Sequence, residues 1–82
     1  MGGWLGKDNR SFKVDATVAI KEAIGDGVVV WAGTIAVPRN VKMEVTLASY
    51  TLKLDDGISG QAYVVKMNDE SGVAYFVGMV NQ

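Results

Sequence analysis

The sequence contains neither cysteine nor histidine, and it has a single proline among its 82 residues. Without cysteine, the chain has no disulfide, no thiolate nucleophile and no cysteine ligand for zinc or an iron–sulfur cluster. Without histidine, it lacks the usual general base near neutral pH and the commonest ligand of transition metals. These absences leave carboxylate, lysine, tyrosine and hydroxyl side chains as candidates for catalysis, and we expect neither a metal nor another cofactor.

The sequence also lacks an excess of charge and a long hydrophobic run. Eight basic and nine acidic residues give a net charge of −1, which supplies no strong field to attract nucleic acid or an anionic membrane. The longest uncharged runs, 27–38 and 71–82, are shorter than the roughly 18 apolar residues that a membrane-spanning helix needs. No apolar secretory signal follows Met1. We therefore expect a soluble cytoplasmic protein that binds neither membrane nor nucleic acid.

The composition is that of one folded domain, because 49% of the residues are hydrophobic and the chain is short. Residues 1–10 contain three glycines and four polar or charged residues, so we expect a flexible N-terminal arm followed by a single domain at 11–82. Trp4 and Leu5 are the apolar exception within the arm. Such a pair is expected to dock on the body of the domain or on a neighbouring subunit.

The stretch 11–24 fits two structures and decides the fold class. Apolar residues alternate with polar ones from Phe12 to Ile20, which is typical of a strand. The same stretch has a helical stripe at Ala16, Ala19, Ile20, Ala23 and Ile24, with Asp15 as a possible N-cap and Gly25 as a possible C-terminal glycine. We favour a short strand at 12–14 followed by a helix at 16–24, although the β-branched Thr17 and Val18 argue against the helix.

The rest of the chain reads as strands separated by turn signals. The expected strands are Val28–Val37, Val41–Leu54 with a bulge near Ala48-Ser49, Ala62–Met67 and Val73–Val80. Gly25-Asp26-Gly27 and Asp55-Asp56-Gly57 are turns, and 68–72 is a loop. The expected fold class is therefore α+β, with a short N-terminal helix packed on a four-stranded antiparallel β-meander. The alternative is an all-β five-stranded barrel or sandwich.

The last two strands are apolar on both faces. The expected core face consists of Tyr63, Val65, Met67, Val73, Tyr75, Val77 and Met79. The opposite face would hold Ala62, Val64, Lys66, Ala74, Phe76, Gly78 and Val80, with a single charge. Since a solvated sheet face is normally polar, we expect the surplus to lie against a second copy of the chain or to line a ligand cavity. A homo-oligomer, most simply a dimer, would be joined around Trp31, Val64, Phe76 and Val80.

No recognised catalytic motif is present. The carboxylate pairs Asp55-Asp56 and Asp69-Glu70 fall in expected turns, where acidic residues promote turn formation, and adjacent carboxylates on a loop tip do not form a glycosidase-like pair. No glycine-rich phosphate loop or nucleophile elbow occurs. We therefore favour a protein without enzymatic activity, and a carboxylate-dependent hydrolase is the least favoured alternative.

The sequence thus predicts a small interaction or ligand-binding module that self-associates. A small apolar ligand would be bound by Trp31, Met43, Tyr50 and Met67. The alternative is a single-stranded nucleic-acid binder in which strand aromatics stack on bases and basic side chains contact phosphates. Its candidate residues are Trp31, Tyr50, Tyr63, Tyr75 and Phe76, with Arg39, Lys42, Lys53 and Lys66.

Overall fold

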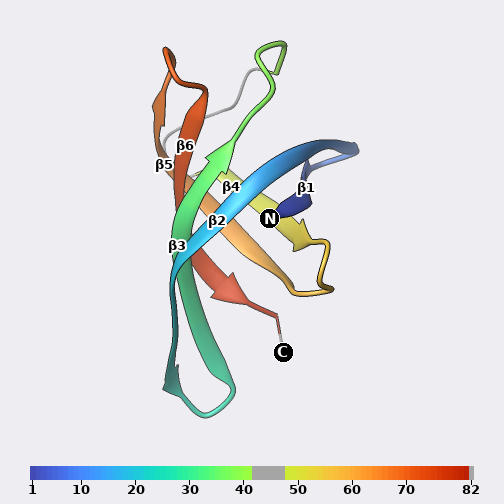
Figure 1. The fold of residues 1–82 in the computed structure, drawn as a ribbon. Helices are drawn as coiled ribbons and strands as arrows, with labels where there is room; N and C mark the ends of the chain where they lie inside the picture. Colours follow the sequence, from blue (N-terminus) through green and yellow to red (C-terminus); the bar gives the residue numbers. More distant parts are fainter. Residues whose placement is uncertain (42–47, 82) are drawn as a thin grey trace.

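The computed structural model, which describes residues 1–41 and 48–81, is an all-β barrel (Figure 1). Its six strands are β1 (Gly2–Lys7), β2 (Arg10–Gly25), β3 (Val28–Ala36), β4 (Ala48–Leu54), β5 (Ser59–Asn68) and β6 (Val73–Val80). All neighbouring strands are antiparallel, and the sheet closes in the order β1-β2-β3-β6-β5-β4. Two three-stranded meanders, β1–β3 and β4–β6, are thus joined by the pairs β1/β4 and β3/β6.

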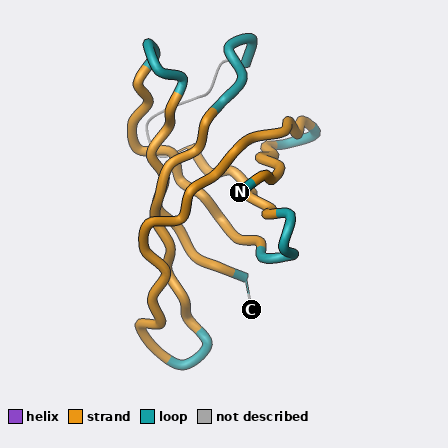
Figure 2. Tube along the Cα trace, in the orientation of Figure 1, coloured by secondary structure: helices purple, strands orange, loops and turns teal. Residues whose placement is uncertain are grey.

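The expected α+β fold is wrong, because none of the described residues is helical (Figure 2). The all-β alternative is closer, although the barrel has six strands instead of five. The stretch expected to form a helix at 16–24 belongs to β2, which pairs with β3 across the Asp26-Gly27 turn. Register shifts lie between Val18 and Ile20 and between Ala23 and Gly25. At each irregularity, the residues that point to one side of the sheet are displaced by one position along β2. The apolar residues are then three or four positions apart, which is also the spacing of a helical stripe.

The expected flexible arm is also replaced by a strand. Gly2–Lys7 forms β1, which lies between β2 and β4 and completes the barrel. Leu5 is fully buried, whereas Trp4 points outward. The sequence signal for an arm was the glycine content, but Gly3 is buried against the backbone of Lys53 and Leu54, where a larger residue would collide. These glycines therefore allow close strand packing.

The later strands agree more closely with the expected ones. β3 and β6 have almost the expected bounds, and the 55–57 turn and 68–72 loop lie between strands as expected. In β4, alternate residues Tyr50, Leu52 and Leu54 are buried. Residues 42–47 of the expected long strand lie outside the described residues, so the bulge expected near Ala48-Ser49 stays a prediction.

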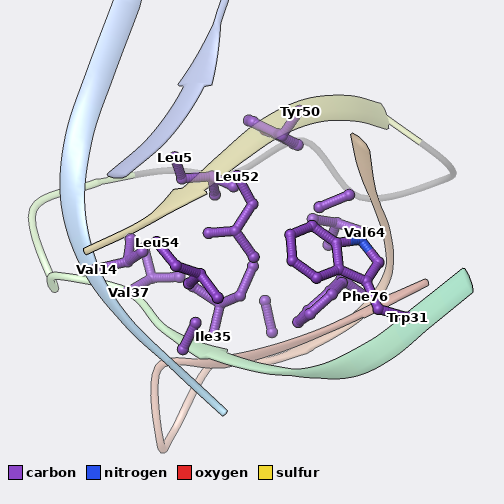
Figure 3. Close-up of a cluster of buried hydrophobic side chains, with 13 residues drawn as sticks. Leu5, Val14, Trp31, Ile35, Val37, Tyr50, Leu52, Leu54, Val64 and Phe76 are labelled. Carbon is purple, nitrogen blue, oxygen red and sulfur yellow. The ribbon is translucent and has the colours of Figure 1, made fainter. Parts of the chain in front are cut away.

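The core fills the barrel interior (Figure 3). It consists of Leu5, Val14, Ala16, Trp31, Ile35, Val37, Tyr50, Leu52, Leu54, Ala62, Val64, Ala74 and Phe76. The rings of Trp31 and Phe76 meet edge to face, with centroids 5.7 Å apart, and the Trp31 indole Nε1 donates a hydrogen bond of 2.8 Å to the carbonyl oxygen of Gln61. No polar or charged side chain is buried among the residues that the structure describes.

The core face expected for β5 and β6 is wrong, because the two faces are exchanged. Ala62, Val64, Ala74 and Phe76 point inward, and the expected core residues Val65, Tyr75, Val77 and Met79 are exposed. Side-chain volume explains the exchange. A six-stranded barrel has a narrow interior, and once Trp31 and Phe76 occupy it, small residues must face them. Tyr63 pairs with Val77 on the outer side, and an irregularity between Val64 and Lys66 shifts the register beyond this pair.

Two glycines permit the tight closure around this core. A Cβ atom at Gly33 of β3 would collide with the carbonyl oxygen of Thr17 on β2, and a Cβ atom at Gly78 of β6 would collide with that of Gln61 on β5. Both contacts are with backbone, which cannot swing aside as a side chain can. The two residues therefore let neighbouring strands approach and coil, as closure of a small barrel requires.

Candidate functional site

One end of the barrel is hollowed by a mainly apolar cavity of about 470 Å³. Its lining residues are Met1, Ala16, Thr17, Val18, Lys21, Trp31, Leu54, Asp56 and Ile58. Beyond this end, the hairpin of β2 and β3 projects from the barrel (Figure 1), and the β2 residues 19–25 in it are all exposed. The cavity is an open mouth, with Lys21 and Asp56 as its charged lining residues.

The residues expected to bind an apolar ligand do not converge on this cavity. Trp31 forms part of its wall, but Tyr50 and Met67 are not among the lining residues. Tyr50 is buried in the core, and the Nζ atom of Lys7 lies 5.6 Å from its ring centroid, within the range of a cation–π contact. Met67 is half-buried and pairs with Ala74, while Met43 lies outside the described residues. Of the predicted partners of Trp31 that the structure describes, neither Tyr50 nor Met67 lines the mouth.

The residues expected at an oligomer interface belong mostly to the interior. Trp31, Val64 and Phe76 are at most 1% exposed, and Val80 is half-buried opposite Val29 and Gly60. Trp31, Val64 and Phe76 are occupied by the core and cannot contact a second copy unless the barrel opens, whereas Val80 is partly accessible. The surplus apolar surface that motivated the prediction lies instead on the outer side of the same strands.

This outer surface forms a continuous apolar patch over β2, β3, β6 and β5. Its centre is a cross-strand row in which Ile20 pairs with Ala32, Ala32 with Val77, and Val77 with Tyr63. Ile20 is 55% exposed and Val77 is 44% exposed. We call this patch the outer apolar face, and its residues are Ile20, Val30, Ala32, Tyr63, Val65, Tyr75, Val77 and Met79. Hydrophobicity alone could not locate it, because the inner face of the same strands is equally apolar.

Two charges stand at opposite corners of the outer apolar face. Lys66 on β5 pairs with Tyr75, in the cross-strand row on one side of the central row. Glu22 on β2 pairs with Val30, in the cross-strand row on the other side. Both side chains are exposed. Three interstrand spacings, roughly 14 Å, separate their strands across the sheet. The patch therefore has an apolar centre and a rim with one positive and one negative corner.

Both acidic pairs lie in turns, as expected, and the Asp56 carboxylate bonds within its own turn. Asp56 Oδ1 accepts a hydrogen bond of 2.9 Å from the Ile58 amide within the β4–β5 turn. In the β5–β6 turn the amides of Glu70 and Ser71 donate to Asn68 Oδ1, at 3.0 and 3.2 Å. Within residues 1–41 and 48–81, no group of three or more acidic side chains is placed to hold a metal ion. The turns thus use their polar side chains to satisfy their own amides.

The expected base-stacking aromatics are divided between the two sides of the sheet. Trp31, Tyr50 and Phe76 are buried and cannot stack on a base, whereas Tyr63 and Tyr75 lie on the outer apolar face. Of the expected phosphate partners, Arg39, Lys53 and Lys66 are exposed on different parts of the barrel, and Lys42 lies outside the described residues. The exposed tryptophan, Trp4, was not among the candidates, although lysines lie on both sides of it.

No segment among the described residues forms a helix long and apolar enough to cross a membrane. No known protein family matches the chain, and neither a curated protein nor a solved structure shows significant similarity to it.

Proposed function

We propose that this protein is a small binding module that self-associates as a dimer through the outer apolar face. The observation that carries the proposal is the row Ile20–Ala32–Val77–Tyr63, which is apolar across four strands on the side of the sheet turned away from the core. Outward positions of an antiparallel sheet with one buried face are ordinarily polar. A contiguous apolar patch of this kind is typical of an interaction surface.

The size of the face predicts the strength of the dimer. Its five most exposed side chains are each about half accessible, so together they offer on the order of 400 Å² of apolar surface. A standard interface buries about 800 Å² per partner, part of which is polar rim. The outer apolar face can therefore supply the centre of a standard interface. We expect a dissociation constant in the micromolar range.

The partner in this proposal is a second copy of the same chain. The centre of the face on β3 and β6 is apolar and can pack on the same surface of another copy about a two-fold axis. Glu22 on β2 and Lys66 on β5 lie on opposite sides of the barrel, three strands apart in either direction, so both charges stay at the rim and add little affinity.

The experiment is sedimentation of the purified chain between about 1 and 100 µM, the range over which a micromolar dimer dissociates. Val77→Asp places a charge at the centre of the face and should weaken the dimer at least about a hundredfold, because the charge would be buried without a partner. Ile24→Lys is the matched control, since Ile24 is 64% exposed at the tip of the β2–β3 hairpin. A wild-type chain that stays monomeric throughout would contradict the proposal.

Charge reversal at the rim provides a second test. Glu22→Lys and Lys66→Glu should each change the dissociation constant by less than about threefold, because the two charges lie on opposite sides of the barrel and outside the centre of the face. A much larger loss in either variant would contradict a dimer centred on β3 and β6.

A further inference from the structure

Trp4 is placed differently from the other tryptophan of the chain. Trp31 is 1% exposed and hydrogen-bonded inside the barrel, whereas Trp4 is 46% exposed on the outer side of β1. Trp4 pairs with Lys13 on β2 and with Lys53 on β4, so that one indole lies between two lysines in a single cross-strand row. Lys13 and Lys53 are both exposed. Tyr75, the exposed tyrosine of β6, has only one lysine, Lys66, among its cross-strand partners, the other being Thr34.

The surface beside Trp4 is hollowed because the next outward residue of β1 is Gly6. Gly6 pairs with Ser11 on one side and Thr51 on the other. A shallow hollow of about 480 Å³ is lined by Trp4, Gly6, Ser11, Thr51 and Lys53. We call these five residues, together with Lys13, the Trp4 platform. Its floor is backbone and its walls are an indole, two hydroxyls and an ammonium group, which suits a flat ring with polar edges.

A second hollow continues the platform toward the tip of the β1–β2 hairpin. It has a volume of about 460 Å³ and shares Gly6, Ser11 and Thr51 with the first. Lys7 and Arg10 are among its lining residues, as are the hairpin residues Asp8 and Asn9 and the hydroxyl of Ser49. The two hollows adjoin and form one track along β1. Lys53 lines the first hollow, and Lys7 and Arg10 line the second.

The basic residues of the chain are concentrated around this track. Lys7, Arg10, Lys13 and Lys53 are four of the eight lysines and arginines in the sequence. Asp8 is the acidic residue within the track. Two further carboxylates lie beyond the row of Trp4: that of Asp15 is paired with the N-terminal ammonium group at 2.9 Å, and that of Asp55 lies over Gly2, so four basic side chains and the N-terminus face three carboxylates. The net charge of −1 therefore conceals a local positive surface. The expectation that nucleic acid is not bound assumed an even distribution of charge.

We propose that the Trp4 platform binds single-stranded nucleic acid, with one base stacked on the indole over Gly6 and the phosphate backbone held by Lys13, Lys53 and Arg10. Stacking on an exposed indole requires an unpaired base, because the faces of bases in a duplex are covered by their neighbours. The lysines on both sides of Trp4 supply the charge that a phosphate backbone needs. Hydroxyls of Ser11 and Thr51 can bond to a base edge or a sugar without selecting one sequence.

The experiment measures binding of a fluorescein-labelled single-stranded oligonucleotide of about 12 nucleotides, a length within the usual range for one small β-barrel. We expect binding at low salt that weakens steeply as salt is added, and weaker binding of the matching duplex. Trp4→Ala should weaken binding about tenfold or more, and Trp4→Phe should recover part of the loss because a phenyl ring still stacks. Quenching of tryptophan fluorescence by the oligonucleotide should disappear in Trp4→Phe, which retains Trp31.

The lysines give an independent test that does not depend on Trp4. Removing both charges in Lys13→Gln/Lys53→Gln should reduce the slope of log K against log salt by about 1.4, since each phosphate contact on a single strand contributes about 0.7. Lys21→Gln is the matched control on the same strand, eight residues from Lys13 and therefore roughly 26 Å away.

Three results would overturn the proposal. One is the absence of binding at low salt, and another is binding that the Trp4 and lysine variants leave unchanged while they remain folded by circular dichroism. The third is a neutral oligosaccharide that binds to Trp4 without salt dependence while the oligonucleotide does not, because it would assign the platform to sugar rings. Should Trp4→Ala fail to fold, the lysine variants and the fluorescence of Trp4→Phe still decide between these outcomes.

Discussion

The outer sides of β6 and β1 lie opposite each other on the barrel, since three steps in either direction around the strand order separate them. Both expose aromatic side chains to a similar extent, with Tyr75 at 44% and Trp4 at 46%. Their neighbours differ. Tyr75 has Thr34 and one lysine, Lys66, as cross-strand partners and borders the apolar row through Val77, whereas Trp4 lies between two lysines. The same exposed aromatic group therefore suits an apolar partner on one side and a polyanion on the other.

The barrel holds the two faces apart, and a substitution in its core is expected to have the largest effect on stability. Trp31→Ala should lower the free energy of unfolding by about 3–5 kcal/mol, because it removes a large buried ring and leaves a cavity beside Phe76. Trp4→Ala should cost at most about 1 kcal/mol, since the indole is half exposed. Urea denaturation of both variants measures the difference. Equal losses would mean that Trp4 is a packing residue and not a surface one.

A smaller loss is expected within the second meander, where β6 approaches β5. Gly78→Ala should lower the free energy of unfolding by about 2–3 kcal/mol, because the new Cβ atom would push the carbonyl oxygen of Gln61 away and part β5 from β6. Gly25→Ala is the control, because the space around Gly25 is open. A Gly78→Ala variant as stable as Gly25→Ala would show that barrel closure does not require this close approach.

Salt should separate the two faces functionally. Between about 50 and 200 mM salt, oligonucleotide binding through three phosphate contacts should weaken about twentyfold, as counterion release predicts. The dissociation constant of the dimer should change by less than about threefold, because its centre is apolar and only charges at its rim are screened. Titrations of both reactions in the same buffers provide the measurement. A dimer as salt-sensitive as oligonucleotide binding would remove the distinction between the faces.

The smallest effect is expected in the β4–β5 turn, which links the strand beside Trp4 to the strand of Tyr63. Asp56→Ala should lower the free energy of unfolding by about 0.5–1 kcal/mol, because the Ile58 amide loses its side-chain acceptor. Thermal unfolding at fixed protein concentration would detect the change. Loss of a hydrolytic activity, with unchanged stability, would instead support the carboxylate role considered from the sequence.

The sequence predicted those features that depend on a few neighbouring residues. The Asp26-Gly27 and Asp56-Gly57 turns lie where expected, since Asp-Gly pairs adopt the required backbone angles locally, with φ of 72° at Gly27 and 93° at Gly57. The expected strands at 28–37 and 73–80 correspond closely to β3 and β6, whose β-branched and aromatic residues favour extended backbone. The helix at 16–24 was wrong because bulges in β2 give the apolar residues a helical spacing.

The candidate sites were harder to predict, because they depend on which side of each strand faces inward. Val64 and Phe76 were expected at an interface, and both are buried in the core. Trp4 was assigned to an arm, since only pairing with β2 and β4 turns a glycine-rich segment into a strand. The lysines beside it are 40 residues apart in the sequence, and no local pattern relates them.

The sequence by itself determined the chemistry that is possible: no thiol or imidazole, turns at the Asp-Gly pairs, and strands that are apolar on both faces. Tertiary structure alone decided which of those faces is the core and which basic residues meet around Trp4. The physical reason is that a narrow barrel has a small interior volume, which side chains from all six strands must fill together. Small residues must face Trp31 and Phe76 inside, so Tyr75, Val77 and Met79 are left on the surface.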